Sequence, residues 1–67
     1  MMTLDEAIGH LDPDGGWDFQ RDGWSLPLLK WLRIAEDGGL VESGVSFDVV
    51  HWRISDAGLA RLRRARG

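Results

Sequence analysis

The chain has 67 residues, no cysteine and a formal net charge of −3. This length allows a single small domain, because a chain of this size buries only about 60% of the surface that its unfolded form exposes. The missing cysteines exclude disulfide bonds, thiolate metal sites and a cysteine nucleophile. The first residues lack the basic and apolar regions of a signal peptide, and no apolar run approaches the roughly 18 residues of a membrane span, so we expect a cytoplasmic protein.

Charge is distributed unevenly along the chain. Residues 1 to 22 carry six acidic side chains and one basic side chain, Arg21, whereas residues 57 to 67 carry four arginines and no acid. Non-specific affinity for nucleic acid depends on the number of phosphates that Lys and Arg neutralise. The acidic N-terminal part therefore argues against nucleic acid as the partner.

A first helix is predicted near the N-terminus. Thr3 and Glu6 fit a capping box, and apolar residues recur at helical spacing from Leu4 to Leu11, which indicates one buried face. Pro13 and the two glycines that follow it are expected to end this helix in a turn.

The segment from Trp17 to Trp24 has a weak pattern. Trp17 and Phe19 alternate as in a short strand, and a turn-forming Arg-Asp-Gly follows them. We expect an irregular arm that aromatic rings hold in place. Residues 1 to 24 are thus predicted to form an acidic helix and an aromatic arm, and residues 25 to 67 a helix, a hairpin and a C-terminal helix.

A second helix is predicted to begin after Ser25, which fits an N-cap, and to end at Gly38 and Gly39. Its buried face carries four residues at helical spacing, namely Leu28, Trp31, Leu32 and Ala35. A strand follows from Leu40, and Ser43-Gly44 with Ser46 is expected to turn the chain.

The C-terminal part predicts a strand and a third helix. Val50, Trp52 and Ile54 alternate with more polar residues, as in a strand with one buried face, so this strand completes a two-stranded hairpin. Ser55 fits the N-cap of the last helix, and Leu59 is placed to close a hydrophobic staple with Ile54. The arginines near its end are expected to stabilise this helix, because cations interact favourably with the negative end of the helix dipole.

Two segments carry a resemblance to a known family. Residues 28 to 40 combine an amphipathic helix with a Gly-Leu-Val strand start, and residues 52 to 59 read Trp-Arg-Ile-Ser-Asp-Ala-Gly-Leu. They resemble the recognition helix and the strand-to-helix element of winged-helix regulators of the MarR and PadR kind, over just over half of the chain. The resemblance implies an α+β, winged-helix-like domain over residues 1–67, with three helices and a two-stranded β-hairpin.

In such regulators the exposed face of the recognition helix enters the major groove of DNA. The resemblance therefore implies a DNA-binding transcriptional regulator as an alternative function, and a homodimer would place two such helices on a palindromic site. The nucleic-acid-binding candidates are Lys30, Arg33, Arg53, Arg61 and Arg64. Arg33 also stands four residues before Asp37, and we favour a solvated ion pair between them over contact with a base.

The four tryptophans indicate a core and an interface. Trp31 and Trp52 are expected to fill the small core. Trp17 and Trp24 fit two roles equally, either a clamp on the core or anchors for a partner, because tryptophan leads the residue types at binding hot spots. In the second role an acidic and aromatic protein-binding surface is predicted, made of Trp17, Asp18, Phe19, Asp22 and Trp24.

Motifs for catalysis, metals or cofactors are missing from the sequence. His10 and His51 lack a metal-ligand spacing. Counting from Asp12, the sixth and twelfth positions of a calcium loop are Trp17 and Gly23, where the EF-hand needs glycine and glutamate. There is no glycine-rich phosphate loop either. We therefore expect neither an enzyme nor a bound cofactor.

These observations favour a protein that acts by binding. We expect a small regulatory or inhibitory protein that contacts another protein, in particular a basic one that itself binds nucleic acid. Size and acidity match compact phage-encoded inhibitors of bacterial defence, anti-CRISPR proteins among them, which work in the cytoplasm of the bacterial host cell. The DNA-binding regulator and a structural adaptor of a larger complex remain alternatives.

Overall fold

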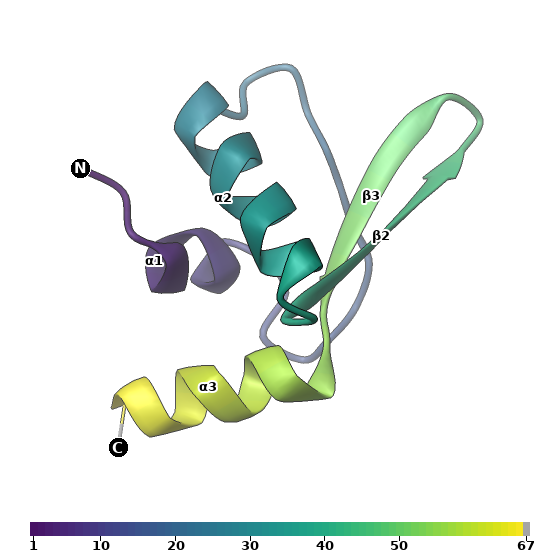
Figure 1. Cartoon of the computed structure of the whole chain (residues 1–67). Helices are drawn as coiled ribbons and strands as arrows, with labels where there is room; N and C mark the ends of the chain where they lie inside the picture. The colour runs from purple at the N-terminus through teal and green to yellow at the C-terminus, as the bar shows by residue number, and fades with distance from the viewer. Residues whose placement is uncertain (67) are drawn as a thin grey trace.

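The computed structural model describes residues 1 to 66, with side chains up to residue 65. The elements follow the order α1 (Leu4–Gly9), β1 (Asp18–Phe19), α2 (Leu26–Asp37), β2 (Val41–Ser46), β3 (Val49–Ile54) and α3 (Asp56–Arg66) (Figure 1). The predicted fold class, α+β with three helices and a hairpin, is confirmed. Within residues 1 to 66, no helix is long and apolar enough to cross a membrane.

Both predicted N-caps of the first two helices form. The Thr3 hydroxyl accepts a hydrogen bond from the Glu6 N–H at 3.2 Å, and the Ser25 hydroxyl accepts one from the Leu28 N–H at 3.3 Å. Each bond satisfies a backbone donor that the first turn of a helix leaves free. The second helix ends at Gly38, and Gly39 takes a left-handed conformation with φ of 76°.

The turn of the hairpin lies at Phe47 and Asp48, so the predicted turn at Ser43-Gly44 with Ser46 is wrong. Strand β2 pairs with β3 over six consecutive positions, from Val41 opposite Ile54 to Ser46 opposite Val49. The two turn residues both have positive φ, 52° and 61°, which matches the twist of a two-residue hairpin loop. The pairing of β2 with β3 therefore outweighs the local turn preference of Ser43 and Gly44.

The sheet has a third strand, which corrects the predicted two-stranded sheet and the irregular arm. Asp18 pairs with Trp52 and Phe19 with His51, and the Gln20 N–H donates to the Val50 carbonyl at 2.8 Å. The strand order is β1-β3-β2, all antiparallel. The arm pairs because β3 otherwise presents a second row of unpaired backbone groups.

The core lies between the sheet and the helices. Its centre is Trp52, which is 1% exposed, and its indole N–H donates to the Gln20 side chain at 3.1 Å. The other buried side chains come from all three helices, from the bend after α1 and from strands β2 and β3: Ala7, Ile8, Leu11, Leu28, Leu32, Ala35, Val41, Ile54 and Leu62. Trp31 is only half-buried at the edge of this core, and its indole N–H donates to the Met2 carbonyl at 3.0 Å.

Helix α3 is joined tightly to the hairpin. The Ser55 hydroxyl accepts from the Gly58 N–H at 3.2 Å, as predicted for an N-cap, and donates to the Gly39 carbonyl at 2.6 Å. Gly58 is buried, and a Cβ on it would overlap the Leu40 carbonyl oxygen and lie 2.7 Å from Cγ2 of Ile54. The serine and the glycine of the strand-to-helix element therefore serve this junction.

Candidate functional site

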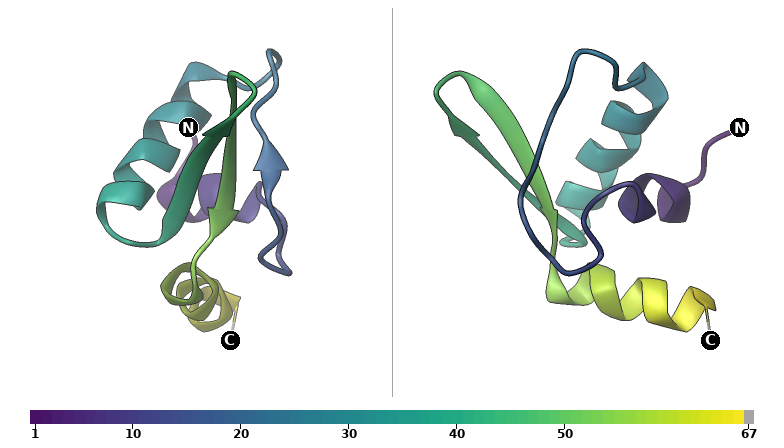
Figure 2. Two further views of the ribbon diagram at one scale, coloured as in Figure 1. Left: turned by 90° about the vertical axis from the view of Figure 1, so that its right-hand side faces the viewer. Right: turned by 180° about the vertical axis from the view of Figure 1, so that it is seen from behind.

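The helices leave one face of the sheet open. In both views of Figure 2, α1 and α2 lie on one side of the three strands, and α3 crosses their end. Side chains alternate between the two faces of a strand, so His51 and Arg53 project away from the buried Trp52 and Ile54. We call this open side the outer face; it carries Trp17, Phe19, Glu42, Gly44, Ser46, Val49, His51 and Arg53.

Three rings form a cluster on the outer face. The His51 ring lies 4.7 Å from that of Trp17 and 5.7 Å from that of Phe19, both in edge-to-face geometry. Trp17 is 45% exposed and Phe19 is 53% exposed. With Ser46 these rings line a hollow of about 200 Å³, which we call the aromatic hollow. Two large apolar rings thus pack against His51 at the surface, and each leaves about half of its area open to solvent.

Gly44 makes room for this cluster. A Cβ at this position would lie 2.9 Å from Nε2 of His51. The other ring nitrogen, Nδ1, is buried and has no hydrogen-bond partner among the residues that the structure describes. A glycine inside strand β2 therefore allows the imidazole to approach the backbone of β2 closely while it contacts the two aromatic rings.

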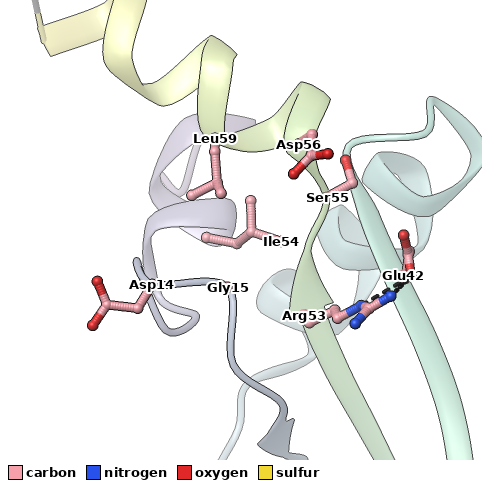
Figure 3. A pocket seen from close by; sticks show the side chains of 8 residues that line it. All are labelled: Asp14, Gly15, Glu42, Arg53, Ile54, Ser55, Asp56 and Leu59. Atoms are coloured by element: carbon pink, nitrogen blue, oxygen red, sulfur yellow. Dashed lines mark hydrogen bonds and ion pairs between the residues drawn. The ribbon is translucent and has the colours of Figure 1, made fainter.

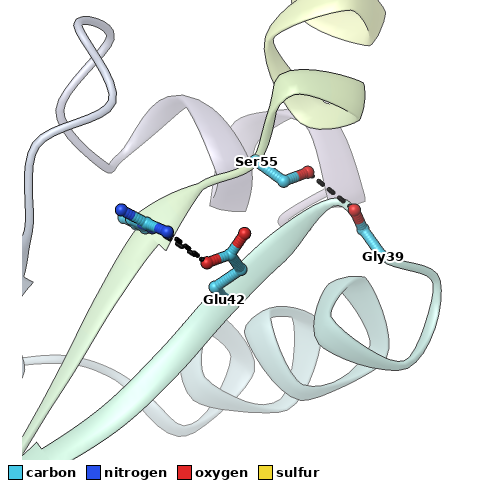
Figure 4. A network of polar contacts seen from close by, with 4 residues as sticks. Gly39, Glu42 and Ser55 are labelled. Atoms are coloured by element: carbon cyan, nitrogen blue, oxygen red, sulfur yellow. Dashed lines mark hydrogen bonds and ion pairs between the residues drawn. The ribbon is translucent and has the colours of Figure 1, made fainter.

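Arg53 is held within the outer face. Its Nε and Nη2 atoms donate to the Glu42 carboxylate at 2.9 and 2.6 Å (Figure 4), and its guanidinium lies 4.7 Å from the centre of the Trp17 ring. The hydrogen bonds to Glu42 pair the positive charge of the guanidinium, and the contact with Trp17 places the guanidinium over the face of the indole ring. Arg53 therefore supports the Trp17 ring, and its charge is already paired with a carboxylate.

A second hollow borders the outer face where the arm, the hairpin and α3 meet. It measures about 250 Å³ and is lined by Asp14, Gly15, Glu42, Arg53, Ile54, Ser55, Asp56 and Leu59 (Figure 3). We call it the acidic hollow, because its lining carries three carboxylates and one guanidinium. Glu42 is neutralised by Arg53, whereas Asp14 and Asp56 take part in none of the ion pairs found within the described side chains.

The tip of the hairpin adds a further exposed ring. Phe47 is 97% exposed and has φ of 52°. A left-handed conformation costs a residue other than glycine roughly 1–2 kcal/mol. Because Phe47 gains almost no burial in return, its position is unfavourable for the isolated chain, and strain of this kind is typical of functional sites.

The predicted protein-binding residues divide into two groups. Trp17 and Phe19 lie together on the outer face, and Asp22 is exposed in the loop that follows β1. Asp18 points to the opposite side of the sheet and pairs with Arg21 at 3.2 Å. Trp24 is half-buried against the core, with its ring 5.2 Å from that of His10. Of the two tryptophans with an open role, Trp17 therefore fits an anchor and Trp24 fits a clamp.

The predicted nucleic-acid-binding residues lie on separate surfaces. Lys30 and Arg33 are exposed on α2, and Arg64 is exposed on α3. Arg53 is bonded to Glu42, and Arg61 donates to Asp5 at 2.7 Å. The predicted ion pair between Arg33 and Asp37 is wrong, because the described ion pairs do not include it. The side chains point to solvent instead, as exposed pairs of this kind gain little free energy.

The binding surface predicted from the sequence did not include His51 or Phe47. The alternation around Trp52 assigned His51 to the polar face, but its contact with Trp17 and Phe19 depends on the pairing of β1 with β3. Within residues 1 to 66 no group of three or more His, Cys, Asp or Glu side chains is arranged to hold a metal ion. Trp17, Phe19 and His51 offer apolar and edge-to-face contacts on the outer face, and Glu42 and Arg53 carry its charges.

Comparison of the chain with protein-family models, with curated proteins and with solved structures found no match.

Proposed function

We propose that this protein acts without catalysis, as a small regulatory or inhibitory protein that binds another protein through its outer face. The observation that carries the proposal is the pair of half-exposed rings, Trp17 and Phe19, packed against His51 on a sheet face that none of the three described helices covers. Buried aromatic anchors provide most of the binding energy in protein interfaces.

Preorganisation supports the same proposal. Trp17 is held from one side by His51 and from another by Arg53, so little side-chain entropy remains to be lost when a partner covers it. Phe47, which is 97% exposed at the hairpin tip, is a further apolar side chain available for contact. Size and net charge remain those of compact phage-encoded inhibitors of bacterial defence, and this class is the specific form of regulation that we propose.

Affinity capture with matched variants tests the proposal. Trp17→Ala combined with Phe19→Ala should remove the captured partner, while the circular dichroism spectrum and the urea midpoint stay close to those of the wild type. Leu26→Ala is the matched control, because Leu26 is an exposed apolar residue on α2, away from the outer face. Equal capture by the double variant and the wild type would reject the outer face as the binding surface.

DNA binding is the second candidate function, and one observation favours it. Lys30 and Arg33 are exposed on the same helix and belong to none of the described ion pairs, so their charges are available to phosphate. This model predicts binding of random duplex DNA at low salt, measured by fluorescence anisotropy, with weaker binding and a flatter salt dependence for Lys30→Ala and Arg33→Ala. Unchanged binding in both variants, or no binding by the wild type, would exclude it.

A further inference from the structure

We infer that the partner presents a basic, extended segment to the outer face, with a Lys or Arg side chain in the acidic hollow and an apolar side chain in the aromatic hollow. This inference rests on the proposed function, since it names the chemistry of the partner that the outer face binds. The aromatic hollow lies on the outer face and the acidic hollow borders this face, and the contact between Arg53 and Trp17 links their linings.

Charge determines the kind of side chain that the acidic hollow accepts. Its lining has a formal charge of −2, from the carboxylates of Asp14, Glu42 and Asp56 (−3) and the guanidinium of Arg53 (+1). The N-terminus of α3, where Asp56 lies, offsets only about half a charge. An acidic segment would be repelled at this place, and a neutral one would gain no charge attraction from the exposed Asp14 and Asp56.

The shape of the lining favours a side-chain cation over a bound metal ion. Within residues 1 to 66 no three acidic or histidine side chains converge closely enough to ligate a metal. A guanidinium or ammonium group on a flexible stem can instead reach separate carboxylates, and its methylene groups can pack on the Leu59 side chain that lines the same hollow.

The aromatic hollow accepts the neighbouring apolar side chain. Trp17 and Phe19 present apolar surface there, and the Arg53 guanidinium already occupies one side of the Trp17 ring. The acidic residues beyond the hollows add to the attraction for a basic segment, because Asp22 and Asp48 are both exposed and also lie outside the described ion pairs. Such a field accelerates encounter with a basic partner and weakens with salt.

Peptide titration followed by nuclear magnetic resonance tests this inference. The probes are a synthetic peptide of alternating arginine and leucine and its counterpart of alternating glutamate and leucine. The basic peptide should shift the indole signal of Trp17 and the amide signals of His51 and Asp56, and the acidic peptide should not. Asp14→Asn with Asp56→Asn should raise the Kd of the basic peptide about fivefold, as expected for the loss of two exposed charge contacts.

The controls separate this inference from the proposed function. Asp37→Asn, on α2, is the matched charge control and should leave the Kd unchanged. Equal binding of both peptides, or a Kd that the two substitutions leave unchanged, would overturn the basic-partner inference while the outer face remains a docking surface. The absence of any outer-face shift with the basic peptide would overturn it as well. Failure of the proposed function has a different signature, namely partner capture that survives the loss of Trp17 and Phe19.

Discussion

Gly58 joins α3 to the hairpin through a contact that no larger residue can make. A Cβ there would overlap the Leu40 carbonyl and lie 2.7 Å from Cγ2 of Ile54. Gly58→Ala should therefore lower the free energy of unfolding by about 1–3 kcal/mol, the usual cost of overpacking, and urea denaturation measures this loss. Gly23→Ala is the control, because a Cβ at Gly23 meets no atom within 4 Å. A loss of the same size in both variants would disprove the tight junction.

Trp17 and Trp24 should differ in their effect on stability. Trp24 packs against the core and against His10, so Trp24→Ala should lower the free energy of unfolding by about 2 kcal/mol. Trp17 rests on the surface, so Trp17→Ala should cost less than about 1 kcal/mol. Thermal unfolding monitored by circular dichroism distinguishes the two, and a larger loss for Trp17→Ala would place that ring in the core.

At the scale of the elements, the hairpin turn stores local strain. Phe47 and Asp48 occupy positions with positive φ, which Asn-Gly fills at lower cost. Phe47→Asn with Asp48→Gly should therefore raise the free energy of unfolding by about 1 kcal/mol and weaken partner capture. Urea denaturation and affinity capture provide the two readouts. A loss of stability instead would mean that Phe47 contributes packing that outweighs its strain.

How well the sequence predicts an element depends on how far apart in sequence its contacting residues are. The caps at Thr3, Ser25 and Ser55 are local, and the sequence predicted all three. Strand β1 has two residues and exists only through pairing with β3, so its pattern alone was too short to identify it. The turn moved from Ser43-Gly44 to Phe47-Asp48 because the register with β3 was not visible in local preferences.

The candidate site could be predicted only in part, because some of its contacts join residues that are far apart in sequence. Composition indicated the aromatic and acidic character of the arm, and the structure places Trp17 and Phe19 on one surface. Asp18 lies between them in sequence but points to the other side, because alternate residues of a strand face opposite sides. Trp24 lies further along the arm and packs on the core, because the chain leaves the sheet after Gln20. His51 joined the site only through tertiary contact.

At the scale of the whole molecule, the sheet separates two surfaces with different chemistry. One surface consists of the outer face, which has exposed rings, and the acidic hollow at its border, which has excess negative charge; the other includes the exposed Lys30 and Arg33 of α2. Two of the other candidate cations, Arg53 and Arg61, are bonded to carboxylates, which reduces the number of phosphates that the protein can neutralise. This distribution favours a protein partner on the outer face over DNA on α2.

A residue-resolved footprint of the captured partner on isotope-labelled protein tests the central claim most directly. We predict that complex formation changes the amide and indole signals of Trp17, Phe19 and His51 and leaves those of Lys30 and Arg33 in place. Changes confined to Lys30 and Arg33, with the outer face unaffected, would contradict this account and assign binding to α2.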